Sequence, residues 1–113
     1  ARDDSIGPRI GRMKQTRPHT RAADLDIQHN GAECCFECAV DGLRCVIDYR
    51  ELDGVMQIFH TRVTPALEGR GIAAAMVRFA LSHAREHALK IDPQCSYVRV
   101  YMQRHPETHD LRV

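Results

Sequence analysis

The sequence Glu68-Gly69-Arg70-Gly71-Ile72-Ala73 decides the fold, because the spacing of apolar residues changes there. Before this segment, from residue 33 to residue 63, apolar and polar residues alternate, which is typical of strands. After it, apolar residues recur about every three or four positions, which predicts a helix over residues 70–88. Glycine adopts the left-handed backbone without strain, so this segment predicts a glycine-rich loop between a strand and a helix.

Turn-forming dipeptides divide the residues before the loop into strands. These dipeptides are Asn30-Gly31, Asp41-Gly42 and Asp53-Gly54, and each favours a hairpin turn. We predict strands near residues 26–29, 33–41, 43–50 and 55–63, and the last three, joined by tight turns, form an antiparallel meander. The last of these strands carries apolar residues on both faces, which is typical of a central strand. Strict alternation places His60 on the face of Ile58, and Thr61 on the face of Phe59.

The residues after the loop complete a single α/β domain over residues 26–113. The pattern predicts a short strand near residues 89–92 and a second helix over residues 95–104, which Pro106 ends. Residues 107–113 read as a polar tail, and we expect His105 and His109 at this exposed end.

Composition and charge exclude several classes of protein. Hydrophobic residues make up 43% and charged residues 27%, close to the average of globular proteins. The net charge is +1, with excess basic residues in 1–25 and excess acidic residues in 26–113. We therefore expect residues 1–25 to be a disordered basic tail, native or appended, and we expect no nucleic-acid partner. The longest apolar run covers residues 72–77, whereas a membrane span needs about 20 residues, so we expect no membrane span.

The chain has five cysteines, an odd number, and this number together with the lack of a signal stretch indicates reduced thiols. No apolar signal stretch follows the basic N-terminus, so we expect a cytoplasmic protein. Cys34, Cys35 and Cys38 are candidate metal ligands, but alternation along a strand separates Cys35 from the other two. His83 and His87 share a helix face, where packing is the ordinary role. The pattern favours structural thiols and no bound metal.

The glycine loop predicts an anion site. Unpaired backbone N–H groups and the positive end of the helix dipole attract a phosphate, and glycine allows its close approach. A helix start without any ligand gives the same pattern. The residues of the loop favour an anion site over a helix start without a ligand. The loop resembles the acetyl-CoA diphosphate loop of the GNAT acetyltransferases, Gln/Arg-x-x-Gly-x-Gly/Ala, with Gly71 fourth and Ala73 sixth. Glu68 stands at the first position, where the motif has Gln or Arg. This is a departure from the motif, since a carboxylate repels a diphosphate, but the positive charge of Arg70 can compensate for it.

Residues 27–111 resemble the minimal GNAT-like proteins of about a hundred residues. The matching motifs include His60-Thr61-x-Val63, Pro93-x-Cys95-Ser96-Tyr97-Val98 and Tyr101-x-x-x-His105-Pro106. The resemblance implies a minimal GNAT-like fold, an antiparallel meander continued by a short strand, with two main helices. It implies that acetyl-CoA enters where the strands near 55–63 and 89–92 separate. The residues implied in cofactor binding are Val63, Glu68, Gly69, Arg70, Gly71, Ile72, Ala73, Tyr97 and Tyr101.

The resemblance also implies acetyl transfer to an unidentified amine. We expect a monomer or weak dimer. Cys95 matches a cysteine proposed to carry the acetyl group, and a helix start after it would lower the pKa of its thiol. His60 is a candidate base, and Tyr97 or Tyr101 a candidate acid for the CoA thiolate. Direct attack by the amine needs no cysteine, so both routes stay open. The alternative is a non-catalytic CoA-binding or interaction module.

Overall fold

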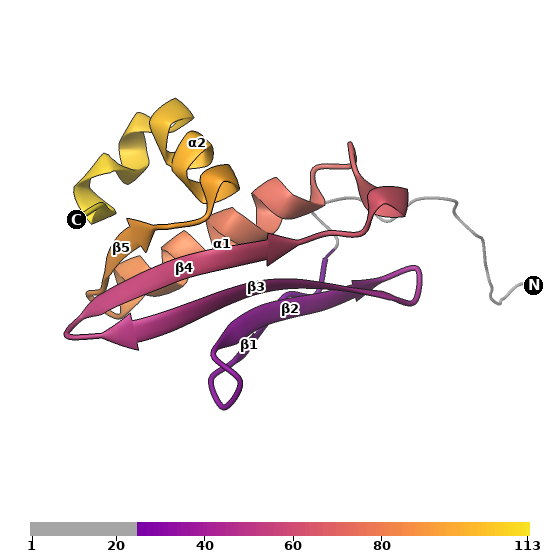
Figure 1. Cartoon of the computed structure of the whole chain (residues 1–113), viewed down its shortest axis with the longest axis horizontal. Coiled ribbons are helices and arrows are strands. Elements are labelled where there is room, and N and C mark those ends of the chain that lie inside the picture. Colours follow the sequence, from indigo (N-terminus) through magenta and orange to yellow (C-terminus); the bar gives the residue numbers. More distant parts are fainter. Residues whose placement is uncertain (1–24) are drawn as a thin grey trace, which may run out of the picture.

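The computed structural model describes residues 25–113, so the tail expected over residues 1–25 lies, apart from Leu25, outside the described residues. Five strands form one sheet in the order β1-β2-β3-β4-β5 (Figure 1). They are β1 (Gln28–Asn30), β2 (Cys35–Val40), β3 (Leu43–Leu52), β4 (Val55–Arg62) and β5 (Lys90–Pro93). The first four form an antiparallel meander, and β5 pairs in parallel with β4. The predicted α/β fold, with its meander continued by a short strand, is confirmed.

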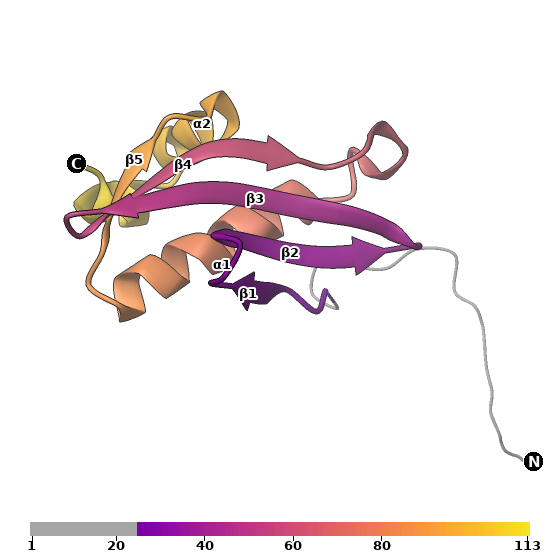
Figure 2. The same ribbon diagram turned by 60° about the horizontal axis from the view of Figure 1, so that its bottom comes forward.

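Two helices cover the same side of the sheet (Figures 1 and 2). α1 (Ile72–Glu86) connects β4 to β5, and α2 (Ser96–Arg104) follows β5, so both predicted helices are present. Two short 3-10 helices, η2 (Pro65–Leu67) and η3 (Pro106–Leu111), were not predicted. No helix within residues 25–113 combines the length and the apolar character needed to cross a membrane.

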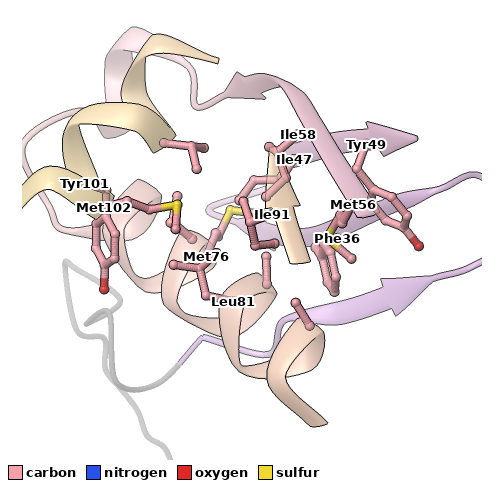
Figure 3. Packing of buried hydrophobic residues seen from close by; sticks show 14 of the residues in the cluster. Phe36, Ile47, Tyr49, Met56, Ile58, Met76, Leu81, Ile91, Tyr101 and Met102 are labelled. Carbon is pink, nitrogen blue, oxygen red and sulfur yellow. The ribbon is translucent and has the colours of Figure 1, made fainter. Parts of the chain in front are cut away.

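One hydrophobic core joins the sheet to both helices (Figure 3). Its fully buried side chains include Phe36, Ile47, Met56, Ile58, Met76, Ile91, Val98 and Met102. Complete burial of a side chain of this size stabilises the fold by about 1.5–3 kcal/mol. The core therefore holds α1 and α2 against β4 and β5, the elements from which the candidate site is built.

The polar tail expected over residues 107–113 is wrong. Leu111 and Thr108 are buried, and the N–H of Val113 donates to the Ile91 carbonyl at 3.0 Å. Nε2 of His109 also lies 2.8 Å from the Met102 carbonyl, although His109 itself is exposed, as expected. This packing could not be predicted, because residues 107–113 are polar apart from Leu111 and Val113.

A β-bulge interrupts β4 at Phe59. Tyr49 of β3 lies opposite Ile58, whereas its neighbour Asp48 lies opposite His60, so β4 has one extra residue there. An extra residue in one strand ends the strict alternation of side chains between the two faces.

The bulge reverses the faces expected for His60 and Thr61. Residues directly opposite each other share a face, so His60 lies with Asp48 on the face away from the core. Thr61 pairs with buried Ile47, which belongs to the core face. The expectation that His60 shares the face of Ile58 is therefore wrong, because alternation alone cannot locate a bulge.

Contacts between histidine rings hold β1 against α1. The ring of His83 lies 4.2 Å from that of His29 and 4.1 Å from that of His87, between ring centroids. It also meets the buried Phe36 ring edge-on at 5.3 Å, and His29 Nε2 lies 2.5 Å from the Tyr49 hydroxyl. The packing role expected for His83 is confirmed. Burial, together with the charges that His29 and His87 would carry, lowers the pKa of His83.

This lowered pKa predicts acid sensitivity between β1 and α1. Below the ordinary histidine pKa of roughly 6.5 the unfolded chain binds more protons at His83 than the folded chain, so the free energy of unfolding decreases. Urea unfolding should therefore show a lower midpoint at pH 5.5 than at pH 7.5. His83→Gln should reduce this difference, whereas His60→Gln, which removes the contact with Asp48 on the other face of the sheet, should not reduce it. Equal reductions in both variants would contradict the prediction.

Candidate active site

A cavity of about 540 Å³ lies where β4 parts from β5. The pairing of the two strands ends at Ile58 and Pro93, but β4 continues to Arg62 while the chain leaves β5 for α2. The cavity is lined from β4, the loop after it, the first turn of α1 and the first turn of α2. The lining residues are Thr61, Val63, Leu67, Glu68, Gly69, Gly71, Ile72, Ala73 and Tyr97.

Most of the residues expected to bind the cofactor meet in this cavity. They are Val63, Glu68, Gly69, Gly71, Ile72, Ala73 and Tyr97. Two others do not line it. Arg70 donates from Nη1 to Oδ2 of Asp41 at 3.0 Å, which ties the loop to the turn between β2 and β3. Tyr101 is buried, and its ring stacks on His105 with 3.9 Å between centroids.

The loop ends in an open helix start. Gly69 and Gly71 have φ angles of 82° and 78°, in the left-handed region that favours glycine. The first hydrogen bond of α1 runs from the N–H of Ala75 to the Gly71 carbonyl at 3.1 Å. The N–H groups of Ile72 and Ala73 precede that bond and lack a helical acceptor, and both residues line the cavity. These donors and the helix dipole favour a negatively charged ligand.

The same loop carries surplus hydrogen-bond donors. Nε and Nη2 of Arg70 are buried and have no hydrogen-bond partner within residues 25–113, and neither has the Thr64 hydroxyl. A buried polar group left unpaired costs about 1–3 kcal/mol. Arg70 adds a positive charge to the loop, but these buried atoms do not line the cavity. The donors available to an anion there are the N–H groups of Ile72 and Ala73, and the exposed Glu68 also lines the cavity.

Cys95 caps the start of α2 beside the cavity. Its N–H donates to the Ile58 carbonyl at 2.9 Å, which continues the contact between β4 and β5 by one further bond. Its Sγ lies 3.5 Å from Oγ1 of Thr61, which does line the cavity. Thr61 was not among the predicted site residues, because only the bulge turns its side chain toward this thiol.

The surroundings of Cys95 favour the thiolate. Burial raises the pKa of the thiol, but the hydrogen bond with Thr61 and the backbone N–H groups of Val98 and Tyr97 outweigh it, so that the pKa is lowered. At Cys38, by contrast, burial is the largest influence and raises the pKa of the thiol to about 11. A thiolate beside a cavity is a suitable nucleophile.

His60 is not brought to the cavity. Its Nδ1 lies 3.1 Å from Oδ2 of Asp48, and 49% of its side chain is exposed. It therefore faces away from the Thr61 side chain that contacts Cys95.

The clustered cysteines diverge. Cys34 is exposed in a turn, Cys38 packs in the core with its Sγ 3.8 Å from Sδ of Met76, and Cys35 is buried on the opposite face. Within residues 25–113, no group of three or more His, Cys, Asp or Glu side chains is placed to hold a metal ion.

Residues 35–111 match the family model of the GCN5-related N-acetyltransferases. The chain belongs to this family. Protein NATD1 of Gallus gallus is 28% identical over 85 residues, covering 73% of this chain and 77% of the relative. Protein NATD1 of Homo sapiens is 27% identical over 100 residues, covering 86% and 83%. An NMR solution structure of a GCN5-like protein from Staphylococcus aureus matches with a TM-score of 0.64 and 28% identity, covering 79% of this chain and 88% of that one. The family resemblance inferred from the loop is confirmed.

The contact between Thr61 and Cys95 predicts the pH dependence of thiol alkylation. The rate of iodoacetamide labelling at Cys95, followed by peptide mass mapping, should reach half of its plateau at a lower pH than an ordinary thiol does. Thr61→Val removes the hydroxyl that lowers the pKa, so the midpoint should rise and labelling at pH 7 should slow severalfold. Thr64→Val removes a hydroxyl of the loop after β4 that has no partner among residues 25–113. It should change neither the midpoint nor the labelling rate at pH 7. A midpoint that does not move in Thr61→Val would contradict this assignment.

Proposed function

We propose that this domain transfers the acetyl group of acetyl-CoA to an amine. The observation that carries the proposal is the cavity between β4 and the start of α1, in a member of an acetyltransferase family. One part of its lining offers N–H donors for a diphosphate, and another offers the Thr61 side chain that contacts the Cys95 thiol.

Each part of acetyl-CoA has a chemically matched surface in this proposal. The backbone N–H groups of Gly69 to Ala73 would hold the diphosphate, with the positive charge of Arg70 on the same loop. The apolar side chains of Val63, Leu67 and Ile72 would contact the pantetheine arm. Tyr97 would supply a proton to the departing CoA thiolate. Burial and the nearby Tyr101 raise the pKa of Tyr97, so this phenol stays protonated at neutral pH.

The covalent route uses Cys95 twice. Its thiolate attacks the carbonyl carbon of the thioester, the bond from that carbon to the CoA sulfur breaks, and the CoA thiolate accepts a proton. An unprotonated amine then attacks the acetyl group on Cys95, releases the Cys95 thiolate and loses a proton to water. The direct route differs in one respect, because the amine itself attacks the thioester. His60 lies on the other face of β4, so in this proposal it is not the base that accepts the amine proton in either route.

A second function has a specific observation in its favour. Glu68 and Tyr97 are the titratable side chains among the lining residues, and no histidine is among them. A CoA-binding or interaction module needs no general base, and such a module would bind CoA without transferring an acetyl group to any amine offered.

Substitution of the loop glycine tests cofactor binding. Calorimetry should detect CoA binding by the wild-type domain. Gly71→Glu should weaken it at least about tenfold, because the side chain blocks close approach and repels a diphosphate. Gly54→Glu is the matched control, since Gly54 has the same left-handed φ, 77°, in the distant turn between β3 and β4. It should lose stability to a similar extent and keep its affinity. A folded wild-type domain that binds no CoA would overturn the proposal.

Substitution of the thiol separates the two routes. Incubation with acetyl-CoA should add one acetyl mass to the peptide containing Cys95, and hydroxylamine should remove it. Cys95→Ala should lose acetyl transfer while keeping its affinity for CoA, because the diphosphate donors lie on another helix. Cys45→Ala, at a buried cysteine of β3, should retain transfer. Full transfer by Cys95→Ala would eliminate the covalent route and leave direct attack.

A further inference from the structure

The middle of the glycine loop has few contacts of its own. Leu67 before it and Ile72 after it are buried in the core. Between them, Gly69 and Arg70 make no backbone hydrogen bond within the described part of the chain. A Cβ atom added at Gly69 would meet no other atom of the described residues within 4 Å, so packing does not hold the backbone on that side. The contact of the Arg70 side chain with Asp41 is what ties this segment to the rest of the domain.

Arg70 stands between two glycines with left-handed backbone, Gly69 and Gly71. Glycine has more backbone freedom than any other residue, so ordering such a segment has a large cost in conformational entropy. A loop that is ordered before its ligand arrives avoids this cost during binding, and its affinity is higher for that reason. Fixing the side chain between the two glycines therefore favours binding at this loop.

Asp41 is a firm anchor for that side chain. It lies in the two-residue turn between β2 and β3, where Asp41 and Gly42 have φ angles of 53° and 77°. Val40, before the turn, is buried and pairs with Leu43 after it, so the turn is fixed to the sheet. Nη1 of Arg70 donates to Oδ2 of Asp41 at 3.0 Å, and the Arg70 side chain is only 18% exposed.

The charge of Asp41 acts against an anionic ligand. A carboxylate repels a diphosphate, and it also neutralises the positive charge of Arg70. On charge alone, the loop would bind an anion better without Asp41, so any contribution of Asp41 to binding comes from position. We propose that Asp41 is a positioning residue, which acts through Arg70 to hold the glycine loop in the conformation that binds the diphosphate of CoA. This inference rests on the proposed function.

The order of the loop in the free chain tests the first step. Asp41→Asn keeps a residue type that suits this turn and removes the charge that holds Arg70. In ¹⁵N relaxation measurements without ligand, the order parameters of the loop amides should fall. Asp53→Asn is the matched control. Asp53 has the same φ of 53° before Gly54, in the turn between β3 and β4, and makes no ion pair within residues 25–113. This control should leave the order of the loop unchanged.

Calorimetry with CoA tests the second step. Asp41→Asn should weaken binding about threefold or more at low salt, although it makes the loop more positive, because a partly exposed ion pair contributes an amount of this order. Since Asp41 acts through Arg70, the same substitution in an Arg70→Gln background should not weaken binding further. Asp53→Asn should bind CoA as tightly as the wild-type chain does.

The possible failures are distinct. An affinity for CoA that rises or stays equal in Asp41→Asn would overturn the positioning role and leave the proposed function standing. Unchanged order of the loop in the free Asp41→Asn chain would overturn the positioning role too. So would a loss of affinity that persists when Asp41→Asn is made in the Arg70→Gln background. No binding of CoA to the folded wild-type chain would overturn the proposed function, and the positioning role with it.

Discussion

The hydrogen bond from the Cys95 N–H to the Ile58 carbonyl, 2.9 Å long, marks the point where β4 and β5 separate. Up to Ile58, β4 is paired on both sides, with β3 and with β5. Beyond it, β4 bulges at Phe59 and continues to Arg62 with β3 alone. The cavity, the thiol at the start of α2 and the turned Thr61 side chain all depend on this one point of divergence.

The bulge and the divergence act together on the chemistry. Without the bulge, alternation would turn Thr61 away from the core face and bring His60 toward it. The Cys95 thiol would then lose the hydroxyl that lowers its pKa. The proposed nucleophile thus depends on an irregularity of the neighbouring strand as much as on its own helix. An exposed His60 and Asp48 pair is left on the opposite face.

Much of the fold could be predicted from the sequence, because its elements follow local rules. Turn dipeptides delimited the strands, and the change of apolar spacing near Gly69 located α1 to within two residues. The bulge at Phe59 could not be predicted, since no residue type there demands it. Likewise the docking of η3 depends on the long-range contact of Leu111 with the core.

The last residues of the chain also protect the sheet from other molecules. An edge strand exposes unpaired N–H and C=O groups that can pair with a strand of a neighbouring molecule. At the β5 edge, Arg112 forms a parallel bridge with Ile91, and Val113 donates to the same residue. At the other edge, β1 is only 3 residues long. Both margins of the sheet therefore offer little length for intermolecular strand pairing, which lowers the tendency of this small domain to aggregate.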